Sequence, residues 1–331
     1  MRNYSNSLVR SITRITLLEY CSKKYYFKYY TGALKNVDQK LRSDTILLKN
    51  LKSLEMRVGE KTHHILSDYL HLLQSKEATP ENINLLKEKI RQNIQEEFEI
   101  SKNRKYENVF EEERFGLTEH YYGEDVDAKL EPCIQKVMNN LDIFIASERN
   151  EKVQRYFDKA QKVFIENPRN QNFEAMKVII PNIPELKNVT IMASPDFGVV
   201  FNPSKYLIID WKSGKEKNDF EGVSDQIKVY ALKSFLKTGL KFEDVEISGY
   251  EVYLPSLNQF GGKITKEDID YIQKKLVEDV SFQKQFIQDG DEIRNEPLAS
   301  SKFLRTKSEK KCQICTFRKV CEELKSYELK N

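Results

Sequence analysis

The chain has 331 residues, and its 54 lysines and arginines nearly balance its 51 aspartates and glutamates, giving a formal net charge of +3. With 17 tyrosines and 18 phenylalanines the chain can bury a core, which excludes global disorder and suits one large domain or two small ones. Such a charge does not indicate a nucleic-acid binder by itself, although a local basic groove would be enough for one.

Membrane insertion and secretion are not expected. No apolar run approaches the roughly 20 residues needed to span a bilayer, and the N-terminus lacks the apolar stretch of a signal peptide. We therefore expect a soluble, cytoplasmic protein. Five cysteines in a reducing compartment do not indicate a disulfide framework, so their spacing has another meaning.

Helices are predicted for the first half of the chain. Apolar spacing predicts one helix over about 11–30 and a second over about 43–73. A further helix is expected to start at Thr79-Pro80, and the charged chain from there to about 155 is mostly helical, with a loop at 123–125. We therefore expect a helical region over 1–155.

Short β-prone runs dominate the centre of the chain. They are predicted at 163–165, 178–180, 189–192, 198–201 and 206–209. A helix over about 220–236, a strand over about 245–254 and a helix over about 266–288 follow, before a cysteine-rich tail. The expected fold class is α/β, a central mixed β-sheet flanked by helices, with its core at 156–260 and a C-terminal segment at 261–331.

A hairpin in this centre brings two acids together. Turn chemistry at 202–204 joins two strands, and with this loop Phe201 pairs with Lys205. In that register Asp196 lies opposite Asp210, and residues opposite each other in an antiparallel pair share a face. A slip by one residue would separate them.

Lys212 shares this face because side chains alternate along a strand. Two adjacent carboxylates repel, and a divalent cation relieves that repulsion, polarises a phosphodiester and lowers the pKa of a bound water. A neighbouring lysine can orient that water or offset negative charge. The plain alternative is a set of surface charges, since an acid-x-Lys triplet arises by chance in a chain with 32% charged residues. The apolar run 207–209 before Asp210 favours function, because burying charges is costly.

The predicted helix after the hairpin carries Gln226 and Tyr230 four residues apart, on one face. They could contact a DNA phosphate or steady Lys212, or they could form an ordinary hydrogen-bonding face.

These motifs resemble those of PD-(D/E)XK nucleases of the RecB-like branch. The resemblance rests on Pro195-Asp196, Asp210-Trp211-Lys212 and Gln226-Ile-Lys-Val-Tyr230. It implies a restriction-endonuclease-like core in which Mg²⁺ or Mn²⁺ is bound by Asp196, Asp210 and the Trp211 carbonyl. It implies catalytic roles for Asp196, Asp210, Lys212, Gln226 and Tyr230.

The same branch places a histidine upstream in a Gly-x-x-x-His pattern, which Gly59-Glu-Lys-Thr-His63 matches. The resemblance implies that His63 is a metal ligand. Without it, the pair His63 and His64 on a polar helix would indicate solvent exposure.

Three cysteines near the C-terminus, Cys312, Cys315 and Cys321, can wrap one metal centre that needs a fourth ligand. Cys133 lies in a helix-like run and is expected to be a buried apolar side chain. Cys21 is followed by a run of aromatics.

The Cys21 segment resembles the first cluster-binding segment of iron–sulfur nucleases such as the AddB family, CRISPR-associated RecB-like exonucleases and exonuclease V. Ser22 stands where proline is usual. The resemblance implies a [4Fe–4S] cluster on Cys21, Cys312, Cys315 and Cys321 that joins the two ends of the chain. Spacing alone leaves structural zinc on the same residues open.

The expected function is metal-dependent hydrolysis of DNA phosphodiester bonds, as an exonuclease on single-stranded or end-containing DNA in repair, CRISPR or defence pathways. The first alternative is an inactive protein that binds DNA or a helicase partner. The second is a redox protein, for which no nucleotide fingerprint is present. The chain lacks a Walker A sequence, so any unwinding would come from a helicase or defence partner.

Overall fold

A computed structural model of the protein describes residues 7–35, 37–108, 115–169, 176–178, 180, 182–216 and 222–328. The strands of the described chain form two sheets. The larger is mixed, in the order β2–β5–β6–β7–β8, and only β6 and β7 run parallel. Its strands are β2 (Lys162–Ile165), β5 (Phe197–Asn202), β6 (Lys205–Lys212), β7 (Glu246–Tyr253) and β8 (Gln259–Lys263). The mixed α/β fold predicted from the sequence is therefore confirmed.

The smaller sheet departs from the prediction of a single central sheet. Its order is β1–β4–β3, with strands β1 (Val9–Arg10), β4 (Thr190–Met192) and β3 (Lys177–Val178). The runs expected at 178–180 and 189–192 belong here, with residue 179 outside the described chain. The strands β1 and β8 were not predicted, because β1 is two residues long and β8 contains two glycines.

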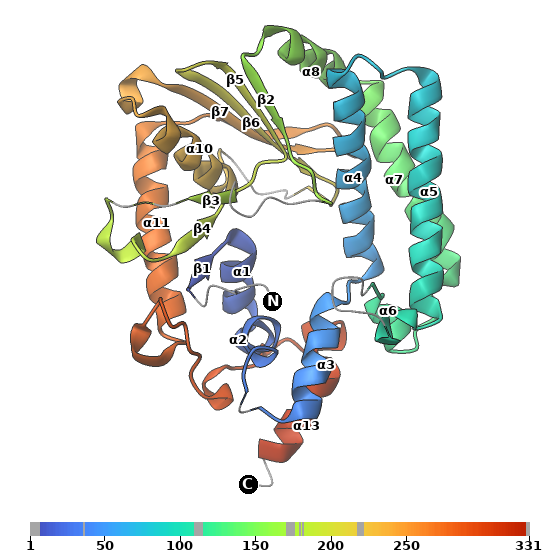
Figure 1. The fold of residues 1–331 in the computed structure, drawn as a ribbon, viewed down its shortest axis with the longest axis vertical. Coiled ribbons are helices and arrows are strands. Elements are labelled where there is room, and N and C mark those ends of the chain that lie inside the picture. The colour runs from blue at the N-terminus through green and yellow to red at the C-terminus, as the bar shows by residue number, and fades with distance from the viewer. Residues whose placement is uncertain are drawn as a thin grey trace.

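Helices cover both faces of the larger sheet (Figure 1). One face packs on α4 (Leu54–Gln74), α7 (Leu130–Ile145) and α8 (Glu148–Lys159), and α5 (Pro80–Lys102) packs against α4 and α7. The other face packs on α10 (Asp225–Thr238) and α11 (Lys266–Lys284). Along β6, Ile209 and Trp211 join the first core and Ile208 joins the second. This alternation turns Asp210 toward α10.

The helix α10 forms the crossover between the parallel strands β6 and β7. It starts at Ser224, whose hydroxyl accepts a hydrogen bond from the Ile227 N–H, and ends at Gly239 with φ +66°. The predicted helix 220–236 therefore starts later, and residues 220 and 221 lie outside the described chain.

The two ends of the described chain lie near each other (Figure 1). They pack around an aromatic core that includes Phe27, Phe303 and Phe317. The N-terminal elements are α1 (Ile12–Tyr20), α2 (Ser22–Tyr26), a π-helical turn (Phe27–Thr31) and α3 (Gln39–Asn50). The C-terminal helices are α12 (Glu309–Gln313) and α13 (Arg318–Glu328). The remaining short helices are α6 (Thr118–Tyr121) and the 3₁₀ turns Lys105–Asn108, Asp127–Lys129, Pro184–Leu186, Phe242–Asp244, Gln288–Gly290 and Ser300–Lys302.

Two predicted helices are each interrupted. The helix expected over 11–30 breaks at Cys21, whose backbone is extended with φ −162° and ψ 97°. The helix expected over 43–73 is two helices, because Lys52 forms a β-bridge with Leu117. The helix predicted from Pro80 is confirmed, with Thr79 as its N-cap. Within the described residues, no helix is both long and apolar enough to cross a membrane.

Candidate active site

The β5–β6 hairpin has the register that brings the two aspartates together. Phe197 pairs with Ile209, so continuing the ladder by one residue puts Asp196 opposite Asp210, as predicted. The predicted pair at the turn is wrong by one residue, because Lys205 pairs with Asn202 and a bulge follows. The bulge is confined to the turn and does not change the facing of the two acids.

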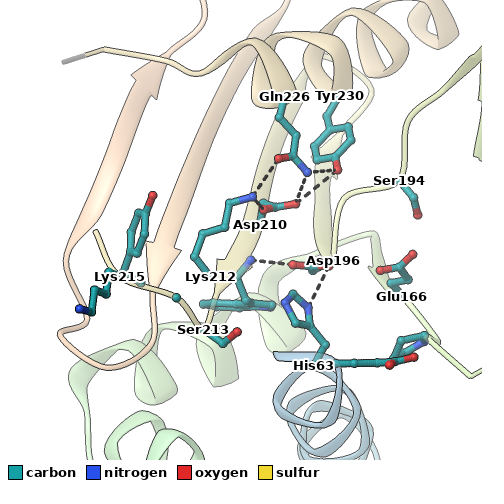
Figure 2. A pocket seen from close by; sticks show the side chains of 15 residues that line it. His63, Glu166, Ser194, Asp196, Asp210, Lys212, Ser213, Lys215, Gln226 and Tyr230 are labelled. Atoms are coloured by element: carbon teal, nitrogen blue, oxygen red, sulfur yellow. Dashed lines mark hydrogen bonds and ion pairs between the residues drawn. The ribbon is translucent and has the colours of Figure 1, made fainter. Parts of the chain in front are cut away.

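All seven residues predicted for the catalytic centre line one open cavity of about 620 Å³ at the end of the larger sheet (Figure 2). They are His63, Asp196, Asp210, Trp211, Lys212, Gln226 and Tyr230. They come from α4, the β5–β6 hairpin and α10. The structure therefore brings together residues up to 167 positions apart in the sequence.

Asp196 is held on both sides. The Trp211 backbone N–H donates to its Oδ2 at 2.6 Å, and the His63 Nδ1 lies 3.4 Å from its Oδ1. Burial opposes ionisation of Asp196, but the charge of His63 and these hydrogen bonds outweigh it and lower the pKa of Asp196. In return, burial lowers the pKa of His63, and the Asp196 carboxylate more than offsets this and raises the pKa to about 9.

Asp210 and Lys212 are held by the side chains of α10. The Lys212 Nζ lies 2.5 Å from Asp210 Oδ2 and donates to Gln226 Oε1 at 2.8 Å. Gln226 Nε2 donates to Asp210 Oδ1 at 3.1 Å and to the Tyr230 hydroxyl at 2.6 Å. The Tyr230 hydroxyl donates to Asp210 Oδ1 at 3.3 Å. Gln226 and Tyr230 thus fix the acid and the lysine relative to one another, as Figure 2 shows.

The electrostatics of this centre favour a bound cation. Burial and the neighbouring charge of Asp196 raise the pKa of Asp210 to about 7. Burial lowers the pKa of Lys212, but the charge of Asp210 more than offsets this and raises the pKa of Lys212 above its usual value. Lys212 therefore stays protonated. The two carboxylates are the kind of ligand that suits Mg²⁺ or Mn²⁺, although within the described residues Asp196, Asp210 and His63 are not yet arranged as a three-ligand site.

The Trp211 carbonyl fits as an additional oxygen donor. The Lys212 carbonyl accepts a hydrogen bond from the Leu254 N–H, directly after β7. Because neighbouring residues of a strand direct their N–H and carbonyl groups to opposite sides, those of Trp211 point toward β5. In the continued register, the residue opposite Trp211 is Pro195, which has no N–H to donate. The proline before Asp196 thereby leaves the Trp211 carbonyl without its usual ladder partner.

Sequence reasoning missed two carboxylates in the same row. Glu166 follows β2, and its N–H donates to the Asp196 carbonyl at 2.9 Å. Glu251 of β7 pairs directly with Asp210 and is 4% exposed. Four adjacent strands thus carry the row Glu166, Asp196, Asp210 and Glu251. A lone acid inside the apolar run 250–254 was the available signal for Glu251. For Glu166 the only signal was its position directly after a predicted strand.

The two new acids have different environments. Burial, and then the charge of Asp196, raise the pKa of Glu166 to about 7. Glu251 lies 3.8 Å from the Lys212 Nζ and accepts a hydrogen bond from the Ser224 hydroxyl at 2.7 Å. Glu251 therefore links Lys212 of β6 to Ser224, the N-cap residue of α10.

The histidine pair is not solvent-exposed as the isolated pattern would indicate. His63 faces Asp196 across the cavity, whereas His64 is buried, and burial lowers the pKa of His64 to about 3. Only His63 is placed to act in the site.

The four cysteines predicted as cluster ligands line a second pocket, where the two ends of the chain meet. Cys21, Cys312, Cys315 and Cys321 surround a space of about 20 Å³, enough for about one water. Cys133 lies apart in α7 and packs against apolar side chains, although it is only partly buried and not fully buried as predicted. Within the described residues, no group of three or more potential ligands is arranged closely enough to hold a metal ion. The structure thus gathers the four thiols without forming a coordination cage.

The fold and the site define an α/β protein with a mixed sheet. Its central hairpin ends in two acids and a lysine, which a glutamine and a tyrosine hold in place. The profile of the PD-(D/E)XK nuclease superfamily matches residues 10–322, and the chain belongs to this superfamily. Its members are generally nucleases, which are hydrolases. Comparison with curated proteins gave no match.

Proposed function

We propose that the protein is a Mg²⁺- or Mn²⁺-dependent DNA nuclease of the RecB-like branch, acting as an exonuclease on single-stranded or end-containing DNA. The observation that carries this proposal is the convergence of Asp196, Asp210 and Lys212 in one cavity, with Gln226 and Tyr230 bonded to the second acid. An ordinary surface hairpin would not bury Asp210 to 4% exposure.

Asp196, Asp210, the Trp211 carbonyl and His63 would hold the cation. When bound, it would polarise the scissile phosphodiester and lower the pKa of a water. His63 has to lose a proton to act as a ligand, so we expect metal binding to release protons.

Lys212 supplies the fixed positive charge of the centre. Its ammonium is positioned by Asp210 and Gln226 and would face the negative charge that develops on the phosphate. Since Gln226 also bonds Tyr230, α10 orients the lysine before substrate arrives. Such preorganisation is what a transition-state contact requires.

We also propose that Cys21, Cys312, Cys315 and Cys321 bind a [4Fe–4S] cluster. Support comes from the gathering of all four thiols around one pocket and from the Lys24 N–H, which donates to the Cys21 Sγ at 3.4 Å. The pocket would have to widen for a cluster, whereas a zinc ion needs less room. Visible absorbance with iron and zinc analysis of the purified protein separates the two: a colourless, zinc-containing protein would refute the cluster.

The main test is digestion of end-labelled single- and double-stranded DNA with Mg²⁺ or Mn²⁺. Asp210→Ala and Lys212→Ala should abolish cleavage and keep the visible absorbance. Lys205→Ala is the matched control, since Lys205 lies on the same strand but pairs with Glu246 at the exposed end. Undiminished cleavage by Asp210→Ala and Lys212→Ala would assign the activity to a contaminant.

The competing proposal is an inactive protein that binds DNA or a helicase or defence partner in the cytoplasm. It predicts DNA binding without metal-dependent cleavage by the wild type. The complete hydrogen-bond network around Asp210 and Lys212 favours the enzyme, because an inactive protein has no need of it.

A further inference from the structure

A second cavity continues from the active site toward the N-terminal helix α1. Its volume is about 420 Å³, and it shares Glu166, Ser194, Gln226 and Tyr230 with the catalytic cavity. Figure 2 shows Ser194 and Glu166 on one side of Asp196, with Lys215 on the other side. The catalytic acids therefore lie part-way along a longer channel, not at its closed end.

Arg14, in the first turn of α1, lines the far part of this second cavity. Its guanidinium carbon lies 4.1 Å from the centre of the Tyr29 ring, and the Lys28 Nζ lies 5.6 Å from the same centre. The Tyr29 ring thus contacts both cations. Lys24, one helical turn before Lys28, lines the cysteine pocket.

Arg14, Lys24 and Lys28 form a basic strip from the second cavity to the cysteine pocket. Among the described residues, none of these three side chains has an ion pair with a carboxylate. The nearby cations Arg10 and Lys52 differ, because they pair with Asp279 and Glu60.

The strip is electrostatically unfavourable as it stands. Burial, followed by the charges of Lys24 and Arg14, lowers the pKa of Lys28. Within the described chain, Arg14 and Lys28 lack a carboxylate partner and repel each other, and an anion placed between them would relieve that repulsion. The free fork of an arginine matches the oxygens of a phosphate particularly well.

We propose that the basic strip binds the phosphodiester backbone of a single nucleic-acid strand on one side of the scissile bond. This inference rests on the proposed nuclease function and adds the path of the substrate. A cavity of about 420 Å³ is the size of a small-molecule pocket, which suits part of one nucleic-acid strand. The contacts are to phosphates, so binding is independent of base sequence.

The test measures binding of fluorescein-labelled oligo-dT of 4, 8 and 16 nucleotides by anisotropy, in Ca²⁺ and over a range of KCl concentrations. Two variants carry Arg14→Gln or Lys28→Gln, and a third carries both. The matched control is Lys266→Gln with Lys274→Gln, which removes two equally charged, exposed side chains from α11. Thermal melting checks that each variant folds, and Arg14→Lys tests rescue.

For the double variant we expect about tenfold weaker binding of the longer oligonucleotides. The slope of log Kd against log[KCl] should fall by about 1.4, since each single-strand phosphate contact contributes roughly 0.7. Arg14→Lys should restore most of the binding. Inorganic phosphate at equal ionic strength should compete weakly; full competition by it would reduce the strip to a simple anion site and overturn the proposal.

The outcomes separate this inference from the proposed function. If the wild type degrades DNA while the double variant binds like the control, the basic strip is refuted and the nuclease stands. The opposite result is that the wild type binds oligonucleotides without cleaving DNA, while the double variant loses this binding. In that case the nuclease proposal fails and the basic strip remains as a strand-binding surface.

Discussion

Replacing Asp210 by asparagine should make the metal-free protein more stable at pH 8. The folded structure raises the pKa of Asp210 from 3.8 to about 7, first by burial and then by the charge of Asp196. A carboxyl with a raised folded-state pKa stabilises the folded state while protonated, and this contribution is lost as the pH rises from about 4 to about 7. At 1.36 kcal/mol per pKa unit, the ionised group costs roughly 4 kcal/mol above pH 7.

Thermal melting at pH 4.5 and pH 8, with and without Mn²⁺, tests this reasoning. We expect Asp210→Asn to melt several degrees above the wild type at pH 8 without metal, and close to it at pH 4.5. With Mn²⁺ at 100 times its Kd the wild type should gain about 2.7 kcal/mol and the variant much less. Glu278→Gln, at an exposed acid of α11, controls for simple loss of charge. A variant that is less stable than the wild type at pH 8 without metal would refute the account of the site.

Four further outcomes are expected. Glu251→Gln should lower kcat about tenfold with KM unchanged in steady-state cleavage, because Lys212 loses a charged neighbour at 3.8 Å; an unaltered kcat would contradict this. Glu166→Gln should weaken Mn²⁺ binding measured by calorimetry, whereas Glu251→Gln should not. Cys315→Ser should lose visible absorbance and melt early, and a coloured, stable variant would argue against the cluster. Asp279→Asn leaves Arg10 unpaired in the core, so urea titration should show a loss of about 3–5 kcal/mol.

The part of the site that the sequence predicts depends on local geometry. Asp196 and Asp210 are joined by a single tight hairpin, so the turn residues and the two-residue alternation are enough to place them together. Gln226 and Tyr230 share a helix face because they are four residues apart. These relations need no knowledge of the rest of the fold.

The parts that were missed depend on long-range pairing. Glu166 enters the row only because β2 pairs with β5, and Glu251 only because β7 lies parallel to β6 after the α10 crossover. The break between α3 and α4 likewise comes from the β-bridge between Lys52 and Leu117, 65 residues away. The Leu54 N–H also donates a hydrogen bond to the Glu119 carboxylate, across the same separation in sequence. No periodicity within one segment reports such contacts.

The four-acid row also indicates where a cation would lie. Lys212 keeps its proton beside Asp210 and Glu251, so that half of the row retains a fixed positive charge. On the other half the balancing charge is His63, which can release its proton and become a ligand. Once it does, Glu166 and Asp196 carry uncompensated negative charge. The cation should therefore bind closer to Asp196 than to Glu251, which leaves Lys212 free to face the phosphate.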